Sequence, residues 1–445
     1  MAKEVKVTSK WYDAHYEAIN NNGHSDPLEL RAMRKQAFDV FKQLGFPTSA
    51  DEDWKYTDLK VLGRTKFDIA KDLTEDALPA AAVDSFKIPN LDAHTLVFLN
   101  GKYAPWLSNT QEISDKIYIA SLANVLSSGE KKQKDLVLSH FGKLAEFGGD
   151  ALAALNTAFV QDGAVVLISK GAVIDKPVYV LFLTTGKGQS TATYPRLFFL
   201  AEEHSEAVIV EDYRSSEVEQ HFTGAISEIS LLGNAKVSYY KVGEESAGAL
   251  HVGKLFVSQK KASVFNAFSL SLGGALVRNE IQVAMTEAGC ETTLNGLSVL
   301  GDGQHVDNHT VLDHMAPHCE SVELYKGVYA GNARGVFSGT VIVQPDAQKT
   351  NAIQSNHSLL LSPDAHIDSR PQLKIWADDV KCTHGATVGQ LDENALFYIR
   401  SRGVPKAEAK NMLIQAFLGE ALQDVKVAAL REYFQSRLLE KLGSI

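Results

Sequence analysis

The stretch Gly233-Asn-Ala-Lys-Val237 combines a polar turn, a small residue and the start of an alternating apolar and polar segment, and similar stretches recur along the chain. The small residues of five such stretches stand 28, 27, 28 and 29 residues apart, at Ala207, Ala235, Ala262, Cys290 and Cys319. Two later stretches, around Ala333 and Ala365, keep the pattern but not the interval. A repeat of this length is typical of a solenoid, in which each repeat forms one structural unit.

The repeat favours a parallel β-helix over other repeat architectures. The blades of a β-propeller usually need about 40 residues or more, which is longer than this interval. Between residues 163 and 390, β-branched and aromatic residues alternate with polar ones, and we find no helical spacing. Alternation places every second side chain on one face of a strand, so each coil can bury its inner side chains against the next coil. An irregular β-sandwich with chance spacing is the alternative that the pattern leaves open.

Helical spacing flanks this region on both sides. Apolar residues recur at intervals of three and four in residues 9–46 and 131–160. After residue 390, Asp392 stands where an N-cap is expected, and Gly403 stands where a helix ends. We therefore predict a mainly β protein with a mostly helical N-terminal domain at 1–160, a β-helix core at 161–390 and a helical C-terminal domain at 391–445. One apolar face is predicted for the second C-terminal helix, with Ala409, Leu413, Ala416, Phe417 and Ala421.

The composition excludes several classes of protein. The net charge is −10 and no basic stripe stands out, which argues against nucleic acid and anionic membranes as partners. Three scattered cysteines make neither a disulfide framework nor a CxxC pair. The first residues lack the apolar region of a signal peptide, and no run of 18 apolar residues occurs. We expect a soluble protein of the reducing cytoplasm.

Cys382 and His384 are the first candidate metal ligands. They stand two residues apart in an extended segment, so in a strand their side chains share one face. A thiolate and a neutral imidazole can both bind iron or zinc, but two ligands make only half of a site. Such a half site would need completion by another subunit. The alternative is a buried cysteine beside a structural histidine.

A second candidate site is the segment His305-Val-Asp-Asn-His309. On one strand, His305, Asp307 and His309 would share a face, and two histidines with one carboxylate are the ligands of mononuclear iron enzymes. The alternative is three polar positions on the outer face of a coil. A carbohydrate-active enzyme is a further possibility for a β-helix, but the adjacent Asp378 and Asp379 would face opposite ways in a strand.

The segment from Pro371 to Asp392, continuing to Gly403, resembles the C-terminal signature of the SufB/SufD family of iron–sulfur cluster assembly proteins. Weaker matches cover the rest of the chain: Asp53-Trp-Lys-Tyr-Thr57, Leu155-Asn-Thr-Ala158 with Asp162-Gly163, and His305-x-Asp-x-His-Thr310 with Cys319-x-Ser321. The segment Lys381-Cys-Thr-His-Gly-Ala-Thr387 is similar to the SufD branch, because SufB proteins carry a Glu-His-Glu-Ala-Thr type segment there. Departures such as Trp376 for the common Tyr and Thr383 for the common Ser leave the Cys-x-His pair intact.

The resemblance implies a right-handed parallel β-helix between helical domains. It also implies a non-catalytic subunit of the SUF system that pairs with SufB through the ends of their β-helices and binds the ABC-type ATPase SufC through its C-terminal helices. An isolated chain would be able to form a homodimer. We assign Arg400, Arg402, Leu413 and Phe417 to the SufC surface.

The resemblance further implies a transient iron–sulfur cluster at the interface with SufB, and none tightly bound to the isolated chain. By its position in the motif, His384 would be the ligand from this chain, with a less certain role for Cys382. The short link from Gly389 to Asp392 would pass motion of the C-terminal helices, driven by SufC, to the strand that carries His384.

Overall fold

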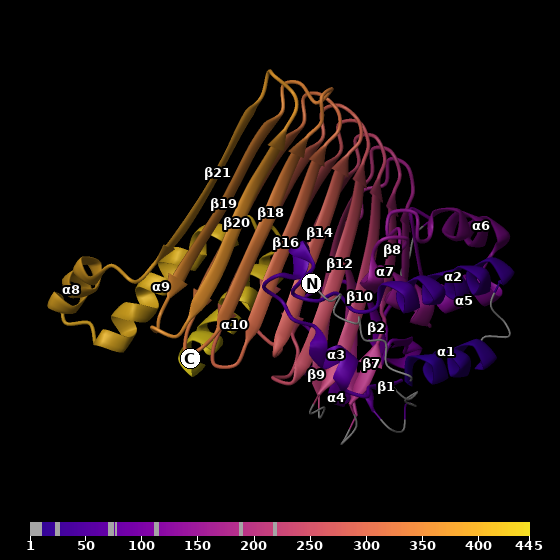
Figure 1. The fold of residues 1–445 in the computed structure, drawn as a ribbon, viewed down its shortest axis with the longest axis horizontal. Helices are drawn as coiled ribbons and strands as arrows, with labels where there is room; N and C mark the ends of the chain where they lie inside the picture. Colours follow the sequence, from indigo (N-terminus) through magenta and orange to yellow (C-terminus); the bar gives the residue numbers. More distant parts are fainter. Residues whose placement is uncertain are drawn as a thin grey trace.

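The computed structural model describes residues 11–22, 27–69, 75, 78–110, 115–186, 190–216 and 220–445 of the chain. Two sheets wound into a solenoid of about seven turns form most of this part, and helices flank the solenoid at both ends (Figure 1). The prediction of a mainly β protein with a parallel β-helix core is confirmed.

The strands of the two sheets alternate along the chain, so that each coil contributes one strand to each sheet. The first sheet has the order β20 (His366–Ile375), β18 (Arg334–Val343), β16 (His305–His314), β14 (Leu276–Met285), β12 (Ala249–Gln259), β10 (His221–Leu231), β8 (Arg196–Ala201), β5 (Gly163–Ile168) and β4 (Ile117–Ser121), with β1 (Asp68–Ile69) and β7 (Thr191–Thr193) beside it. The second has the order β21 (Lys381–Gly389), β19 (Asn351–Leu360), β17 (Glu320–Tyr329), β15 (Glu291–Leu300), β13 (Val264–Ser271), β11 (Lys236–Glu244), β9 (Glu206–Ser216), β6 (Val178–Thr185), β2 (His94–Leu99) and β3 (Lys102–Tyr103). The pairs β2–β3 and β4–β5 are antiparallel, and the other neighbours are parallel.

The register explains the repeat and corrects part of it. Lys236 pairs with Val264 and Val264 with Glu291, so the repeat interval is one full coil. The buried small residues that precede these strands stack in one column: Ala235, Ser263, Cys290 and Cys319. Four of the proposed stretches were wrongly aligned with this column, and one of them, at Ala262, is off by one residue because Ser263 occupies the position. Ala207 lies inside β9, while Ala333 and Ala365 precede strands of the other sheet, because each coil has two corners that need similar turn residues.

The space between the sheets holds a long apolar core with polar groups buried inside it. Inward side chains from successive strands, such as Ile209, Leu294 and Phe337, form one cluster along the solenoid. Glu211 lies among them and accepts hydrogen bonds from Ser227 Oγ and Tyr239 Oη, both at 2.5 Å. Glu211 is therefore held by hydrogen bonds from its neighbours inside the solenoid.

Most N-terminal helices cover the outer face of the first sheet, and the short helix Ala80–Asp84 packs against the second sheet. The N-terminal helices are α1 (Trp11–Asn22), α2 (Leu28–Leu44), α3 (Lys60–Arg64), α4 (Ala80–Asp84), α5 (Leu122–Ser128), α6 (Lys131–His140) and α7 (Ala151–Phe159), with short 3₁₀ turns at Glu52–Trp54 and Pro105–Leu107. Phe41 and Phe159 pack with Phe222 and Val252 of the sheet. Strands β2, β3 and β4 precede residue 160 and already belong to the two sheets, while the domain boundaries themselves stay a prediction.

The C-terminal helices are α8 (Glu393–Ser401), α9 (Lys406–Leu422) and α10 (Ala428–Ser444). The side chain of Asp392 accepts the amide hydrogen of Asn394 and caps α8, as predicted. The buried face of α9 contains Ala409, Ile414, Leu418, Ala421 and Leu422. The predicted face was therefore partly wrong, since Leu413 and Phe417 are half-buried and Ala416 is exposed. No helix in the described ranges has the length and apolar character needed to cross a membrane.

Candidate functional site

The last coil of the solenoid carries both candidate ligands. Cys382 and His384 lie on β21, which is the outermost strand of its sheet and pairs only with β19 (Figure 1). The register places Cys382 beside Ala352 and His384 beside Gln354, whose side chains point into the solenoid. The two residues share one face, as predicted, and this face is the inner one.

The two residues differ in exposure at this end of the solenoid, which no further coil of the described chain covers. His384 is exposed, whereas Cys382 is half-buried and packs against the interior apolar cluster. Burial raises the pKa of the Cys382 thiol, against a smaller lowering by a hydrogen bond from the Ala352 backbone. The neutral thiol is therefore the favoured form of Cys382, and the imidazole is the accessible ligand.

The open end is also apolar and has unpaired strand edges. Trp376 is 58% exposed and Val388 is 51% exposed, and Ile375 lies beside Trp376 at the end of β20. Among the described strands, β20 and β21 are the last of their sheets, so no described strand pairs with the outer side of either. An exposed apolar rim next to open strand edges is typical of a surface that pairs with another protein.

The residues of the second candidate site have partners within the chain. His305, Asp307 and His309 do share the outer face of β16, but each is engaged by another part of the chain. Thr57 Oγ1 lies 3.0 Å from His305 Nε2 and donates to Asp307 Oδ2 at 2.6 Å. Arg278 forms an ion pair with Asp307 and lies 3.1 Å from His309 Nδ1. Among the residues with described coordinates, no group of three or more His, Cys, Asp or Glu could hold a metal ion.

The position of Trp54 explains why the histidines of β16 are covered. The segment around Trp54 lies across the outer face of the first sheet, and the Arg278 guanidinium stacks 3.9 Å from the centre of the indole. Trp54 itself is buried, and Arg370 near the end of the solenoid reaches Glu52 at 2.7 Å. The aromatic motif thus anchors a loop of the N-terminal domain, and the histidines lie under that anchor.

The carboxylates considered for a carbohydrate-active enzyme are exposed or have other partners in the chain. Asp378 and Asp379 are both exposed, and Asp379 is paired with Lys349. Asp313 accepts a hydrogen bond from Gln344 Nε2 at 3.0 Å. These carboxylates do not form the facing pair that glycoside hydrolysis uses.

The predicted SufC-docking residues fall into two groups. Arg400 and Arg402 are exposed on and just after α8, and Arg402 stacks on the Tyr398 ring at 5.2 Å. Leu413 and Phe417 are half-buried on α9, where Lys326 of the solenoid lies 4.7 Å from the Phe417 ring. Phe417 is thus partly engaged within the chain.

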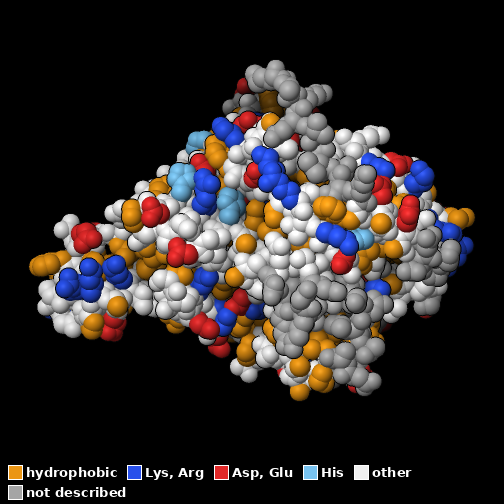
Figure 2. Space-filling view, turned by 60° about the horizontal axis from the view of Figure 1, so that its bottom comes forward, with side chains coloured by type: hydrophobic (Ala, Val, Ile, Leu, Met, Phe, Trp, Pro, Cys, Tyr) orange, Lys and Arg blue, Asp and Glu red, His pale blue; other side chains and the backbone are white. Residues whose placement is uncertain are grey.

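The most exposed aromatic residues of this region were missed. Phe397 is 73% exposed and Tyr398 is 60% exposed, both on α8. The sequence carries a signal for them, because Leu396, Phe397 and Tyr398 are consecutive and a helix cannot bury three consecutive side chains on one face. Figure 2 shows apolar and basic side chains next to each other at the left-hand end of the molecule, where Figure 1 places α8.

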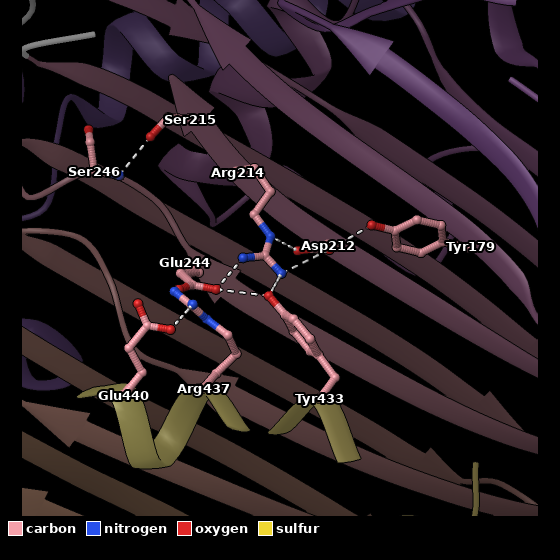
Figure 3. A network of polar contacts seen from close by, with 9 residues as sticks. All are labelled: Tyr179, Asp212, Arg214, Ser215, Glu244, Ser246, Tyr433, Arg437 and Glu440. Atoms are coloured by element: carbon pink, nitrogen blue, oxygen red, sulfur yellow. Dashed lines mark hydrogen bonds and ion pairs between the residues drawn. The ribbon is translucent and has the colours of Figure 1, made fainter. Parts of the chain in front are cut away.

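The helix α10 is fixed to the solenoid by a buried ion network (Figure 3). Arg214 on β9 binds Asp212 through Nε at 2.6 Å, pairs with Glu244, and donates to the hydroxyl of Tyr433 on α10. Arg437 of α10 pairs with the same Glu244. The network joins the C-terminal helices to the middle of the solenoid, while α8 lies apart from it.

Comparisons with known proteins identify the family. Residues 182–417 match the family described as "SUF system FeS cluster assembly, SufBD core domain", and residues 4–180 match "SufBD protein N-terminal region". An iron–sulfur cluster assembly SufBD family protein of Synechocystis is 33% identical over 96% of this chain and 95% of its own length. The iron–sulfur cluster assembly protein SufD of Escherichia coli is 30% identical over 89% of this chain and 90% of its own.

SufD of Bacillus subtilis is 27% identical over 97% of this chain and 98% of its own length. Both domain matches and these relatives span nearly all of the solenoid and its flanking helices. The chain therefore belongs to the SufB/SufD family of iron–sulfur cluster assembly proteins.

Proposed function

We propose that the chain is a non-catalytic SufD-type subunit of the cytoplasm, which pairs with SufB, binds the ATPase SufC and supplies one ligand to a nascent iron–sulfur cluster. Family membership supports the role in cluster assembly, and relatives named SufD support the assignment to that branch. The observation that carries the proposal is the exposed imidazole of His384 on the inner face of the uncovered last coil.

A single imidazole is an incomplete site. Iron–sulfur clusters are commonly held by about four protein ligands, and this end of the chain offers His384 and the half-buried Cys382. The remaining ligands would come from SufB, and the cluster would be a cargo assembled at the interface and then released. An isolated chain would hold no cluster tightly, because too few ligands remain.

The open end is the surface proposed for SufB. Strand edges on β20 and β21 can continue into the sheets of a second β-helix, while Trp376 and Val388 contribute apolar contact. A second copy of this chain would occupy the same surface when SufB is absent. Both arrangements place His384 next to a partner.

The exposed end of α8 is the surface proposed for SufC. Phe397 and Tyr398 offer aromatic anchors, with Arg400 and Arg402 beside them. Only residues 390–392 separate β21 from α8. Movement of α8 by SufC would therefore act directly on the strand that carries His384, while α10 stays fixed by its ion network.

Replacing His384 tests the ligand role. The His384→Ala variant, co-purified with SufB and SufC of the same organism, is expected to lose roughly 10-fold or more of the cluster absorbance, since changing even a residue that only hydrogen-bonds to a metal ligand costs about 10–100-fold. Assembly of the three proteins should be unchanged, because an exposed side chain contributes little to the fold. Cluster content is read from the visible spectrum together with iron and sulfide analysis.

The matched control is His366→Ala, another exposed histidine, which lies on the outer side of β20. It should retain full cluster content. A His384→Ala complex with the same cluster content as the His366→Ala complex would contradict the ligand role. Metal analysis of the isolated wild-type chain tests the alternative function, a mononuclear iron enzyme. One tightly held iron per chain would favour that enzyme.

Replacing Phe397 tests the SufC surface. We expect Phe397→Ser to weaken SufC binding by about 30-fold, because truncating a central aromatic anchor costs about 2 kcal/mol or more. The thermal unfolding midpoint should stay the same, since the side chain is 73% exposed. Leu439→Ser is the control, because Leu439 is an exposed apolar residue on the anchored helix α10. Equal SufC affinity in the two variants would place the surface elsewhere.

A further inference from the structure

Gln354 lies directly behind His384 in the solenoid. The two residues are register partners on β19 and β21, and their side chains point to the same inner face. Neighbouring strands are about 4.8 Å apart, so the two side chains start within reach of each other. Gln354 is 1% exposed, whereas His384 is exposed. The buried Gln354 amide thus lies on the strand next to the proposed ligand, on the inner side of the solenoid.

The Gln354 amide is held in place from two sides. Its Nε2 donates to Glu323 Oε2 at 2.6 Å, and Glu323 is the register partner on the next strand inward. Gly339 on the opposite sheet leaves room for the amide, because a Cβ there would lie 2.4 Å from Nε2. The orientation of the amide is therefore set by its neighbours.

The other end of the amide lacks a partner. Gln354 Oε1 is a buried acceptor without a hydrogen bond to any described group. A buried polar atom without a partner is unfavourable, because it has given up its hydrogen bonds to water. The imidazole of His384 carries an N–H group at neutral pH and can turn toward this oxygen about its two side-chain torsions.

We propose that Gln354 is a positioning residue for His384, accepting a hydrogen bond from one imidazole N–H so that the other ring nitrogen is free to bind metal. Metal-binding histidines generally donate their second ring N–H to a carboxylate, carbonyl or water, which fixes the tautomer and the ring orientation. Gln354 supplies such an acceptor from the coil below. The benefit for cluster binding rests on the proposed function, while the hydrogen bond itself does not.

The test is the tautomer of His384 in the full-length chain. Nitrogen-15 labelled histidine is observed by NMR at pH 8, and the His384→Ala variant identifies its signals. Wild type should show one dominant tautomer of His384. The Gln354→Met variant should shift both ring nitrogens to the values of His204, an exposed histidine on a distant turn. Glu320→Gln, which changes an exposed residue at the start of β17, should keep the wild-type pattern.

A second variant provides the test if Gln354→Met does not fold. If Gln354→Met unfolds, Gly339→Ala displaces the amide by its added Cβ and should give the same change of tautomer. Ring signals of His384 that are identical in wild type and in the folded variant would overturn the inference. In the complex with SufB and SufC, Gln354→Met should weaken iron retention against a chelator by about 10–100-fold. A tautomer change combined with normal cluster assembly in His384→Ala would leave the hydrogen bond standing and reject the ligand role instead.

Discussion

Replacing Arg214 by methionine should lower the free energy of unfolding by about 3–5 kcal/mol, because it breaks a buried ion network by removing one partner. Asp212 is completely buried and also accepts a hydrogen bond from Tyr179 Oη at 2.7 Å. Burial raises the pKa of Asp212, and Arg214 is the largest influence that opposes this rise. Without the guanidinium, Asp212 must take up a proton or stay charged without a partner.

The loss of stability in this variant should be largest in α10. Arg214 donates to Tyr433 Oη and its guanidinium lies 5.3 Å from the Tyr433 ring, while Glu244 bridges Arg214 and Arg437 (Figure 3). We therefore expect amide hydrogens of residues 428–444 to exchange faster than those of β9 in the variant. Urea unfolding gives the global change, and hydrogen exchange followed by mass spectrometry locates it.

The same network contains its own control. Glu440 pairs with Arg437, but its side chain is 66% exposed. Exposed ion pairs contribute about 0–1 kcal/mol, so Glu440→Gln should have almost no effect on stability or exchange. If Arg214→Met were no more destabilising than Glu440→Gln, the network would not be what fixes α10 to the solenoid.

The sequence predicts the fold well because the solenoid is repetitive. Each coil presents similar corners and alternating strands, so the interval of 29 residues between Cys290 and Cys319 already gives the length of a coil. The exact alignment of corners is harder to predict. A coil has two of them, and Ala333 has the turn pattern of the first corner although it lies at the second.

Spacing also predicts which side chains share a face, but not what they meet there. His305, Asp307 and His309 lie together as their alternation requires. Their partner Thr57 comes from a loop about 250 residues earlier in the chain, and no local pattern reveals such a contact. For β21 the spacing was sufficient, because the uncovered last coil leaves His384 without a covering layer.

The C-terminal helices show a second limit of sequence prediction, because spacing locates a helix but not the face that packs on the solenoid. Periodicity on α9 selected Leu413 and Phe417, yet the helix rests on the solenoid through Ile414 and Leu418, one residue further along. A shift of one position turns a helical face by about 100°, since a turn takes 3.6 residues. Which face is covered depends on where the solenoid lies, and the helix sequence alone does not contain that information.

Glu323 should make the stability of the protein depend on pH near neutrality. It is completely buried, and burial raises its pKa to about 7, against smaller lowering by hydrogen bonds with Thr310 and Gln354. The native state thus binds a proton more tightly at Glu323 than the unfolded chain does. The corresponding stability is fully present below the unfolded pKa of about 4.3 and is lost as pH rises through about 7.

We expect Glu323→Gln to remove this pH dependence. Between pH 4.5 and pH 8, the variant should gain about 3 kcal/mol relative to wild type, which follows from the raised pKa. All other titrating groups are common to both chains, so the difference between their urea unfolding energies at each pH isolates Glu323. Glu320→Gln, at the exposed start of the same strand, is the matched control.

A constant difference for Glu323→Gln would show that Glu323 has the same pKa in the folded and the unfolded chain. The outcome bears on the end of the solenoid, because a charged Glu323 can only accept from the Gln354 amide, whereas a protonated one can also donate. Above pH 7 the carboxylate therefore fixes Gln354 with its oxygen directed away from Glu323. Glu323, Gln354 and His384 form one inward column across three coils, so the buried acid and the exposed imidazole are connected through a single amide.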